Sequence, residues 1–251
     1  MSVSCDDNNI KIWDTHNWEC IFDINNINKQ GDLYSACFIK EKDDIYIATS
    51  NRNKEGDSEK IKIFNFYGQN IQELDNSNEN TLFLDSYFDK KSSKNYIISA
   101  NFGHVKSYDY IKNKIYHTYS DIDDNRGHYS VIIKDFGNTV HLYESCTDGN
   151  IRIWDFHEGT LLTKIKVSDE GLRGICLWDD NYIFAGCDDK TINLVHIKKK
   201  LIIKKLEGHN NKVITLKKII HPKYGACLIS QAFKRDQIKL WKNKNNLSKD
   251  I

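Results

Sequence analysis

The stretch Ile151-Arg152-Ile153-Trp154-Asp155 decides the fold of this chain of 251 residues. In an extended strand, its two isoleucines face one side and Trp154 faces the other, because side chains alternate along a strand. A strand that is apolar on both faces belongs in a sheet that is covered on both faces. The stretch also follows Asp148-Gly149, a strong turn signal, so we expect the strand to begin after a tight turn.

The same pattern recurs along the chain: an apolar residue, a polar one, a small or apolar one, then usually a bulky one. The copies begin at Ile10, Ile61, Val105, Ile151, Ile192 and Ile238. Their fourth positions are spaced 51, 44, 46, 41 and 46 residues apart. A near-constant period in roughly the 20–50 residue range predicts stacked structural units.

Each unit is expected to consist of β-strands. Short runs alternate with period two and are rich in Ile, Val, Tyr and Phe, as in Tyr46–Thr49, Tyr96–Ser99 and Tyr182–Ala185. Turn residues separate these runs, and no stretch shows a sustained helical period. The aromatic content of 12% favours a packed fold over disorder. The sequence therefore predicts an all-β protein.

These motifs resemble those of the tryptophan-aspartate (WD) repeat β-propellers, and the resemblance covers essentially the whole chain. Trp13-Asp14 and Trp154-Asp155 carry the dipeptide that names the family, and Gly127-His128 and Gly208-His209 match the dipeptide that opens a unit. Degenerate versions of the first dipeptide are Phe64-Asn65, Tyr108-Asp109, Val195-His196 and Trp241-Lys242. The resemblance implies a ring of four-stranded blades, a fold that hosts many unrelated functions.

We expect residues 1–251 to form one β-propeller domain of six blade equivalents, in which the first and last blades are incomplete. The first would contain strands b, c and d (Ser2–Cys5, Ile10–Trp13 and Glu19–Ile24), and the last would contain a, b and c (Val213–Ile220, Ala226–Gln231 and Gln237–Trp241). Four whole blades would begin near Leu33, Thr81, Tyr129 and Leu172. About 28 strands make a seven-bladed ring. The expectation is therefore part of such a ring, with an N-terminal portion missing.

Two histidines are candidate structural residues. In the family that the chain resembles, the histidine bonds an acidic residue in the b–c turn, in a chain of contacts ending at the strand c tryptophan. His128, Asp148 and Trp154 match that pattern. His209 and Trp241 match it too, although Asp236 lies one residue off register. The alternative, a catalytic or metal-binding role for these histidines, is disfavoured because packing roles outnumber sites in such a fold.

The sequence shows no pattern that indicates catalysis, a metal or a cofactor. The seven cysteines lack disulfide-like or CxxC spacing, and Cys5, Cys146 and Cys187 occupy one repeat position, two residues before a turn aspartate. Free thiols suit a reducing cytoplasm or, alternatively, a nucleus. No phosphate-cradling glycine loop, nucleophile elbow or HExxH motif occurs. We therefore expect a non-enzyme without cofactors, with chemistry in a central channel as the least favoured alternative.

Charge is distributed unevenly along the chain. Residues 194–251 hold 15 Lys and Arg against 3 Asp and Glu, whereas residues 1–193 hold 21 against 32. A basic sector can attract nucleic acid or a phospholipid headgroup, and such binding is the alternative function. The competing interpretation is a solvated rim, since strand edges commonly carry lysine. No apolar run approaches the length of about 18 residues that a membrane helix needs.

The leading functional hypothesis is a non-catalytic scaffold that binds other proteins or peptides through its loop faces. The resemblance implies that the d–a and b–c loops share one face, called the top face. Phe102 and Tyr129 would be aromatic anchors there and Arg173 a polar one, the residue types enriched at binding hot spots. The full set of top-face candidates is Phe102, Tyr129, Thr147, Arg173, Asp188, Asn211 and Arg235.

Overall fold

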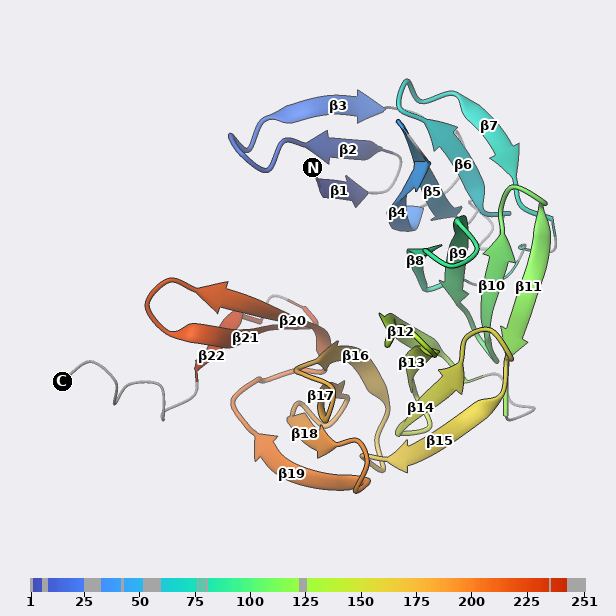
Figure 1. Cartoon of the computed structure of the whole chain (residues 1–251). Helices are drawn as coiled ribbons and strands as arrows, with labels where there is room; N and C mark the ends of the chain where they lie inside the picture. The colour runs from blue at the N-terminus through green and yellow to red at the C-terminus, as the bar shows by residue number, and fades with distance from the viewer. Residues whose placement is uncertain are drawn as a thin grey trace. The chain divides into compact units, whose positions relative to one another are not determined.

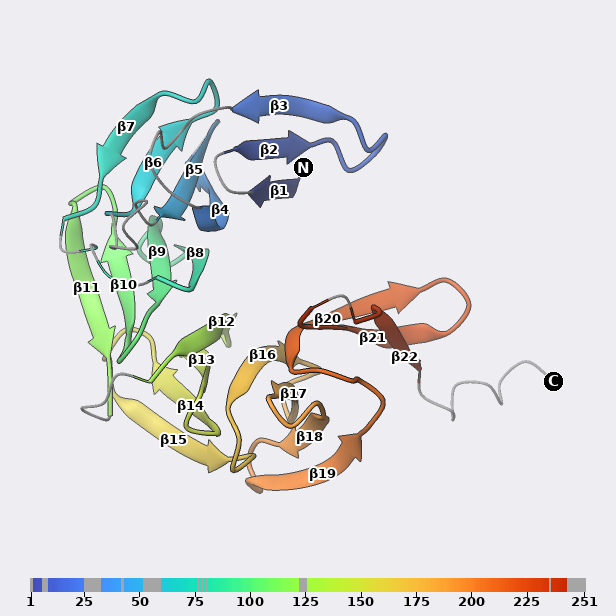
Figure 2. The same cartoon turned by 180° about the vertical axis from the view of Figure 1, so that it is seen from behind.

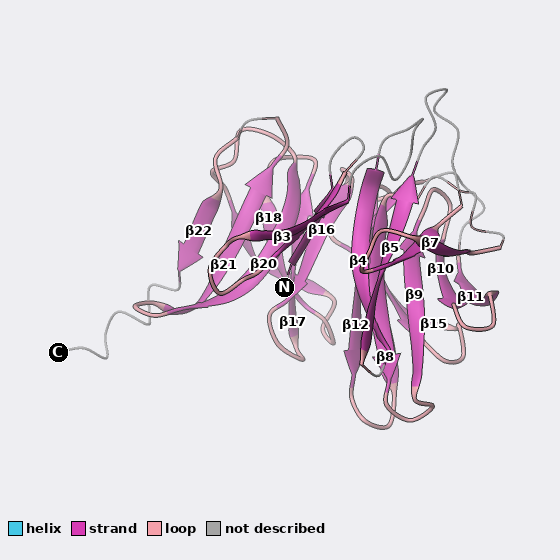
Figure 3. Cartoon of the chain, turned by 90° about the horizontal axis from the view of Figure 1, so that it is seen from above, coloured by secondary structure: helices cyan, strands magenta, loops and turns pink. Residues whose placement is uncertain are grey.

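The computed structural model contains strands, turns and short connections, and no helix occurs among the residues it describes (Figure 3). These residues form two compact units, residues 1–127 and 128–251. Because the described residues contain no helix, none of them forms a helix that could cross a bilayer. The described residues are 2–5, 9–24, 33–41, 43–51, 60–75, 77, 79, 81–121, 126–234 and 236–242.

The first unit contains three antiparallel sheets, and in each sheet every strand pairs with its neighbour in the chain (Figure 1). The first sheet has three strands, β1 (Ser2–Cys5), β2 (Ile10–Trp13) and β3 (Cys20–Ile24). The second has four, β4 (Leu33–Glu41), β5 (Asp44–Asn51), β6 (Lys62–Asn65) and β7 (Asn70–Glu73). The third also has four, β8 (Phe83–Asp89), β9 (Lys94–Ala100), β10 (Val105–Asp109) and β11 (Lys114–Tyr119).

The second unit also contains three antiparallel sheets of consecutive strands. Here the two four-stranded sheets come first and the three-stranded sheet comes last (Figure 2). Its first sheet has β12 (His128–Asp135), β13 (Val140–Cys146), β14 (Asn150–Asp155) and β15 (Leu161–Lys166). The next has β16 (Leu172–Leu177), β17 (Tyr182–Cys187), β18 (Ile192–His196) and β19 (Leu201–Leu206). The last described sheet has three strands, β20 (Val213–His221), β21 (Gly225–Ala232) and β22 (Lys239–Lys242).

Apolar side chains fill the space between consecutive sheets within each unit. In the second unit, Ile151 and Ile153 of β14 pack in one cluster with Ile175 of β16 and Ile183 of β17. A second cluster joins the β16–β19 sheet to Val213 and Leu216 of β20. Both faces of the middle sheet are therefore covered, which explains strands that are apolar on both faces. Trp154 is 2% exposed, in agreement with its expected burial opposite the isoleucines.

The all-β prediction is confirmed, and the strands fall close to the predicted positions. The predicted blade starts near Thr81 and Tyr129 correspond to β8 and β12, which begin at Phe83 and His128. The first described sheet comprises three strands and so does the last, as the strand assignment from sequence requires. The count of six blade equivalents, their place in a seven-bladed ring, the single domain and the missing N-terminal portion stay predictions.

Candidate functional site

Four side chains of the second unit meet where strands of three sheets begin or end, and we call them the Arg173 cluster: Tyr129, Arg173, Asp188 and Lys212. Arg173 is the second residue of β16, and Asp188 follows the last residue of β17. The register pairs Leu172 with Cys187, so the chain direction alone brings Arg173 beside Asp188. Arg173 Nε and Nη2 donate to the two carboxylate oxygens of Asp188, at 2.8 and 2.9 Å.

Tyr129 and Lys212 complete the cluster from the neighbouring sheets. The Arg173 guanidinium carbon lies 4.0 Å from the centre of the Tyr129 ring, within the range of a cation–π contact. Lys212, the residue before β20, donates from Nζ to Asp188 Oδ2 at 3.1 Å. Asp188 therefore holds two cations, one against an aromatic face and one on the solvent side, where 47% of the Lys212 side chain is exposed.

The charges of the cluster favour the ionised forms of Asp188 and Arg173. Burial opposes ionisation of Asp188, but the hydrogen bonds and charges of Arg173 and Lys212 prevail and lower the pKa of Asp188. Burial likewise opposes the charge on Arg173, and the bond to Asp188 and the contact with Tyr129 prevail and raise the pKa of Arg173. At neutral pH, Asp188 is thus a carboxylate and Arg173 a guanidinium cation, held beside the half-buried Tyr129.

Thr147 approaches the cluster through its backbone. The Asp188 backbone NH donates to the Gly171 carbonyl at 2.8 Å. A Cβ built on Gly171 would lie 3.0 Å from Asp188 Oδ2 and 3.2 Å from the Thr147 Cα. The absence of a side chain at Gly171 therefore allows the turn after β13 to pack closely against the turn after β17.

The remaining top-face candidates, Asn211, Phe102 and Arg235, are not members of the Arg173 cluster. Asn211 is half-buried, and its side-chain oxygen accepts from the Lys212 backbone NH at 2.9 Å. Phe102 belongs to the first unit, where it forms an isolated bridge with Gly127. Arg235 lies outside the described residues. Sequence reasoning missed Lys212, although its place directly before the first strand of a sheet, next to Asn211, could have indicated it.

His209 and Trp241 are joined by a complete chain of hydrogen bonds. His209 Nδ1 lies 2.9 Å from Asp236 Oδ2, and His209 Nε2 lies 2.6 Å from Ser230 Oγ. Trp241 Nε1 donates to the same Ser230 oxygen at 2.7 Å. Because a carboxylate only accepts, Nδ1 carries the proton, and in the neutral ring Nε2 accepts from the serine hydroxyl. Asp236 thus joins the network despite its register, since six residues separate β21 from β22.

His128 differs from the expected pattern. Asp148 does not serve His128, because both of its carboxylate oxygens accept from Arg152, at 3.3 Å from Nη1 and 2.6 Å from Nη2. His128 Nδ1 instead lies 3.2 Å from Glu144 Oε2. Arg152 and Glu144 are both fully buried, and their Nε and Oε1 atoms are 3.7 Å apart. The expected His128–Asp148–Trp154 chain is therefore replaced by a buried cluster around Arg152, whose charge needs carboxylates when it is removed from water.

Counting residues back from the turn between β13 and β14 could have predicted the Arg152–Glu144 pair. Only three residues separate β13 from β14, and the register places Glu144 directly opposite Arg152. Directly opposed, oppositely charged residues on neighbouring strands are a stabilising pair. The repeat pattern drew attention to Asp148 instead, because that residue is the one that the resembled family uses.

The described cysteines are free, and all of them except Cys20 are buried. Burial is the main cause that raises the pKa of Cys146 to about 12 and that of Cys187 to about 11, so both remain neutral thiols. The side chain of Cys5 lies outside the described residues. Within the described part of the chain, no group of three or more His, Cys, Asp and Glu residues has the arrangement of a metal site.

Comparison with solved structures identifies the fold. The crystal structure of the WD40 β-propeller domain of Doa1 superposes with a TM-score of 0.75 at 16% sequence identity, covering 97% of this chain and 76% of that domain. The chain has a WD40 β-propeller fold. The computationally designed Ika8 protein also matches, with a TM-score of 0.63 at 18% identity over 96% of this chain and 67% of its own.

Sequence comparison gives shorter matches. The U3 small nucleolar RNA-associated protein 21 homolog of Schizosaccharomyces pombe is 28% identical over 72 residues, which are 29% of this chain and 8% of that protein. The nuclear distribution protein PAC1 of Saccharomyces cerevisiae is 36% identical over 59 residues, 24% of this chain and 12% of PAC1. The matches thus span about a tenth of these relatives' length. No family model matches the chain.

The basic sector, residues 194–251, contains both paired and exposed lysines. Lys205 donates to Asp189 at 3.1 Å, and the Lys218 ammonium lies 4.9 Å from the centre of the Trp178 ring. Lys198, Lys199 and Lys200, in contrast, are exposed in the turn between β18 and β19. Several lysines counted in the sequence therefore already have partners within the fold. Binding of nucleic acid or a phospholipid headgroup by this sector stays a prediction.

Proposed function

We propose that this chain is a non-catalytic scaffold that binds a protein partner through the Arg173 cluster. The WD40 β-propeller is a fold that typically acts as a protein-interaction scaffold and is generally non-catalytic. The observation that carries the proposal is the two-point pairing of Arg173 with Asp188, in contact with the Tyr129 ring. This arrangement holds an arginine and a tyrosine in fixed positions at the ends of the strands.

The cluster has two properties of a binding hot spot. Tyr and Arg are the residue types enriched in such positions, and both are partly exposed here. Their orientation is already set before a partner arrives, so little side-chain freedom is lost on binding. A partner carboxylate or backbone carbonyl could accept from Lys212, and an apolar side chain could cover Tyr129. A cytoplasmic or nuclear location is part of the same proposal.

The test compares partner capture by the wild-type chain and by the double variant Tyr129→Ala with Arg173→Ala. Partners are first identified by affinity purification and mass spectrometry, then purified, and their dissociation constants are measured. A matched control is Tyr224→Ala with Lys242→Ala, because the Lys242 ammonium also lies over an aromatic ring, at 4.5 Å. We expect about tenfold weaker binding or worse in the first variant alone, a loss of about 1.4 kcal/mol. Unchanged affinity for every partner would remove this surface from the proposal.

A further inference from the structure

The second unit contains a pocket at the opposite ends of the strands from the Arg173 cluster. Its volume is about 500 Å³, within the range of about 300–1,000 Å³ found for ligand sites. Tyr129 lies at the start of β12, whereas Phe136 of the pocket follows its end. Arg173 lies at the start of β16, whereas Asp180 of the pocket follows its end. The pocket is therefore separate from the surface proposed above.

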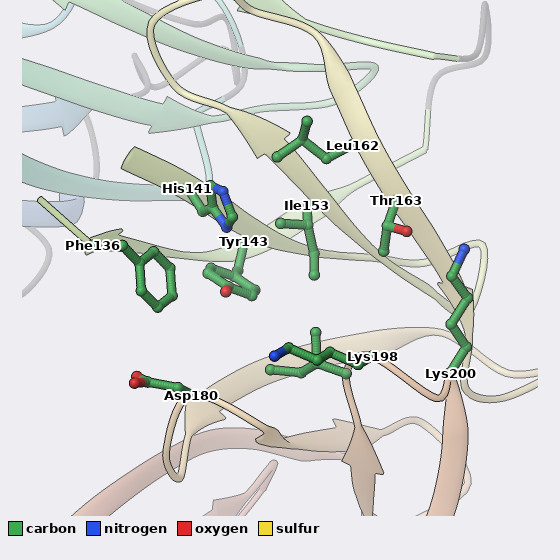
Figure 4. Close-up of a pocket in the computed structure, with 10 residues that line it drawn as sticks. Phe136, His141, Tyr143, Ile153, Leu162, Thr163, Asp180, Lys198 and Lys200 are labelled. Carbon is green, nitrogen blue, oxygen red and sulfur yellow. The ribbon is translucent and has the colours of Figure 1, made fainter. Parts of the chain in front are cut away.

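One wall of the pocket is apolar and largely aromatic (Figure 4). Phe136 and His141 have ring centres 5.0 Å apart, and His141 and Tyr143 have ring centres 6.3 Å apart. Ile153 and Leu162 extend this wall along β14 and β15. Leu162 is 48% exposed, so part of the apolar wall faces solvent. Such a wall suits a flat or bulky apolar group that enters between two sheets.

The opposite wall carries the charges. Asp180, Lys198 and Lys200 line the pocket from the turns of the β16–β19 sheet, with Asp180 near Phe136 and Lys200 near Thr163 (Figure 4). Asp180 Oδ1 lies 3.2 Å from Lys134 Nζ, so its charge already has a partner. Lys198 and Lys200 are exposed, and the described residues give neither of them an ion pair. The pocket therefore presents an excess of positive charge.

Tyr143 adds a neutral polar group at the base of the aromatic wall. Burial raises the pKa of Tyr143 to about 12, with a smaller contribution from the Asp180 carboxylate. The phenol thus keeps its proton at neutral pH and can donate a hydrogen bond. The lining combines an apolar wall, the neutral hydroxyl groups of Tyr143 and Thr163, the Asp180 carboxylate and two lysine ammonium groups.

We propose that this pocket binds an acidic peptide segment of a partner protein, with one aromatic or large aliphatic side chain against Phe136, His141 and Tyr143. Carboxylates that flank this side chain would pair with Lys198 and Lys200. Charge complementarity carries the choice of occupant, because two lysines without carboxylate partners border an aromatic and aliphatic wall, while the one lining carboxylate, Asp180, already pairs with Lys134. An apolar contact alone would leave these lysines unused, and a purely anionic ligand would leave the aromatic wall uncovered.

The probe is the fluorescein-labelled peptide Asp-Glu-Asp-Phe-Asp-Glu-Asp, whose binding to the full chain is followed by fluorescence anisotropy. Two comparison peptides replace either the central Phe by Ala or all the acidic residues by Lys. The charge-reversed variant is Lys198→Glu with Lys200→Glu. Its matched control is Lys217→Glu with Lys223→Glu, which has the same net charge and changes two exposed lysines of the β20–β22 sheet. A second variant, Thr163→Trp, fills the pocket from β15 without altering charge.

We expect the acidic Phe peptide to bind the wild type and the control, and to lose about tenfold or more in affinity with either pocket variant. The Ala and Lys peptides should bind about tenfold more weakly than the probe. Equal affinity in the charge-reversed variant and its control would overturn the proposal. Preferential binding of a single-stranded oligonucleotide or an anionic lipid vesicle would also overturn it. The Tyr129 and Arg173 double variant should retain the peptide, so the two proposals can fail separately.

Discussion

Asp188 accepts two hydrogen bonds from Arg173, one from Nε at 2.8 Å and one from Nη2 at 2.9 Å. Pairing at two points fixes the plane of a guanidinium as well as its position. A single contact would leave the group free to rotate about its side chain. The aspartate that follows β17 therefore determines how the arginine of β16 is presented beside Tyr129.

This two-point pairing should give a measurable coupling energy. In a double-mutant cycle of Arg173→Ala and Asp188→Ala, followed by urea unfolding, we expect a coupling of about 1 kcal/mol. This value is the upper end of the range for exposed ion pairs and lies below that for charged hydrogen bonds, because the pair is partly exposed. Lys134 and Asp180 form the matched control, since their side chains are 42% and 63% exposed. That pair should give about 0.5 kcal/mol or less. Equal couplings in the two cycles would contradict the fixed geometry.

Ser230 should contribute to stability through its two ring partners. It is 1% exposed, and Ser230→Ala deprives both Trp241 Nε1 and His209 Nε2 of their hydrogen-bond partner. Buried polar groups left without a partner cost about 1–3 kcal/mol, so we expect a loss in that range in urea unfolding. Gln231→Ala, at the exposed neighbouring position, is the control and should change stability little. A loss below about 0.5 kcal/mol would show that the hydrogen-bond chain is not structural.

The strands could be predicted from the sequence because the same four-residue pattern occurs in six copies along the chain. Each copy combines a turn signal with a period-two apolar pattern, and burial between sheets enforces that pattern independently of which residue supplies it. Ile151 and Ile153 illustrate this, since both lie on one side of β14, as expected, and pack in one cluster with residues of the β16–β19 sheet. Arg173 and Asp188 were also predictable as neighbours on one face, because loop ends of adjacent antiparallel strands must meet.

The polar networks were harder to predict, because hydrogen-bond partners depend on details of turn length. Asp236 lies one residue off register by counting, yet the longer turn before β22 brings it to His209. Asp148 was on register, yet the buried Arg152 takes its carboxylate. A competing side chain thus changes the partner of Asp148, and a longer turn keeps the expected partner of Asp236, without a change in the fold. Pocket residues such as Lys198 and Tyr143 come from different sheets and share no sequence motif.

Asp236 should make stability depend on acidity. Hydrogen bonds from the Asn210 backbone and from His209 lower the pKa of Asp236 to about 2. A carboxyl group with a pKa depressed in the folded state stabilises the fold above its ordinary pKa of about 3.9, and this stabilisation disappears as pH falls through the folded value. We expect the wild type to exceed Asp236→Asn in stability at pH 7, with a difference that shrinks as the pH falls from about 5 towards 2. Urea unfolding at several pH values measures it.

The control for this experiment is Asp169→Asn, because the Asp169 side chain is fully exposed. Its effect on stability should be small and nearly constant over the same pH interval. A pH-independent difference between the wild type and Asp236→Asn would show that the Asp236 carboxylate does not hold His209 through its charge.

Gly149 should tolerate no side chain, because a Cβ there would collide with Ser168. This effect can be measured separately from backbone strain. Its φ of +80° favours glycine, and a Cβ there would lie 1.9 Å from the Ser168 carbonyl oxygen. Gly137 has almost the same φ, +83°, but a Cβ there would have nothing within 4 Å. Gly137→Ala should therefore cost only the left-handed strain of about 1–2 kcal/mol. Gly149→Ala should cost clearly more, since the turn before β14 must also move away from Ser168. Thermal and urea unfolding of the two variants compare them directly, and equal losses would mean that the close approach to Ser168 contributes nothing.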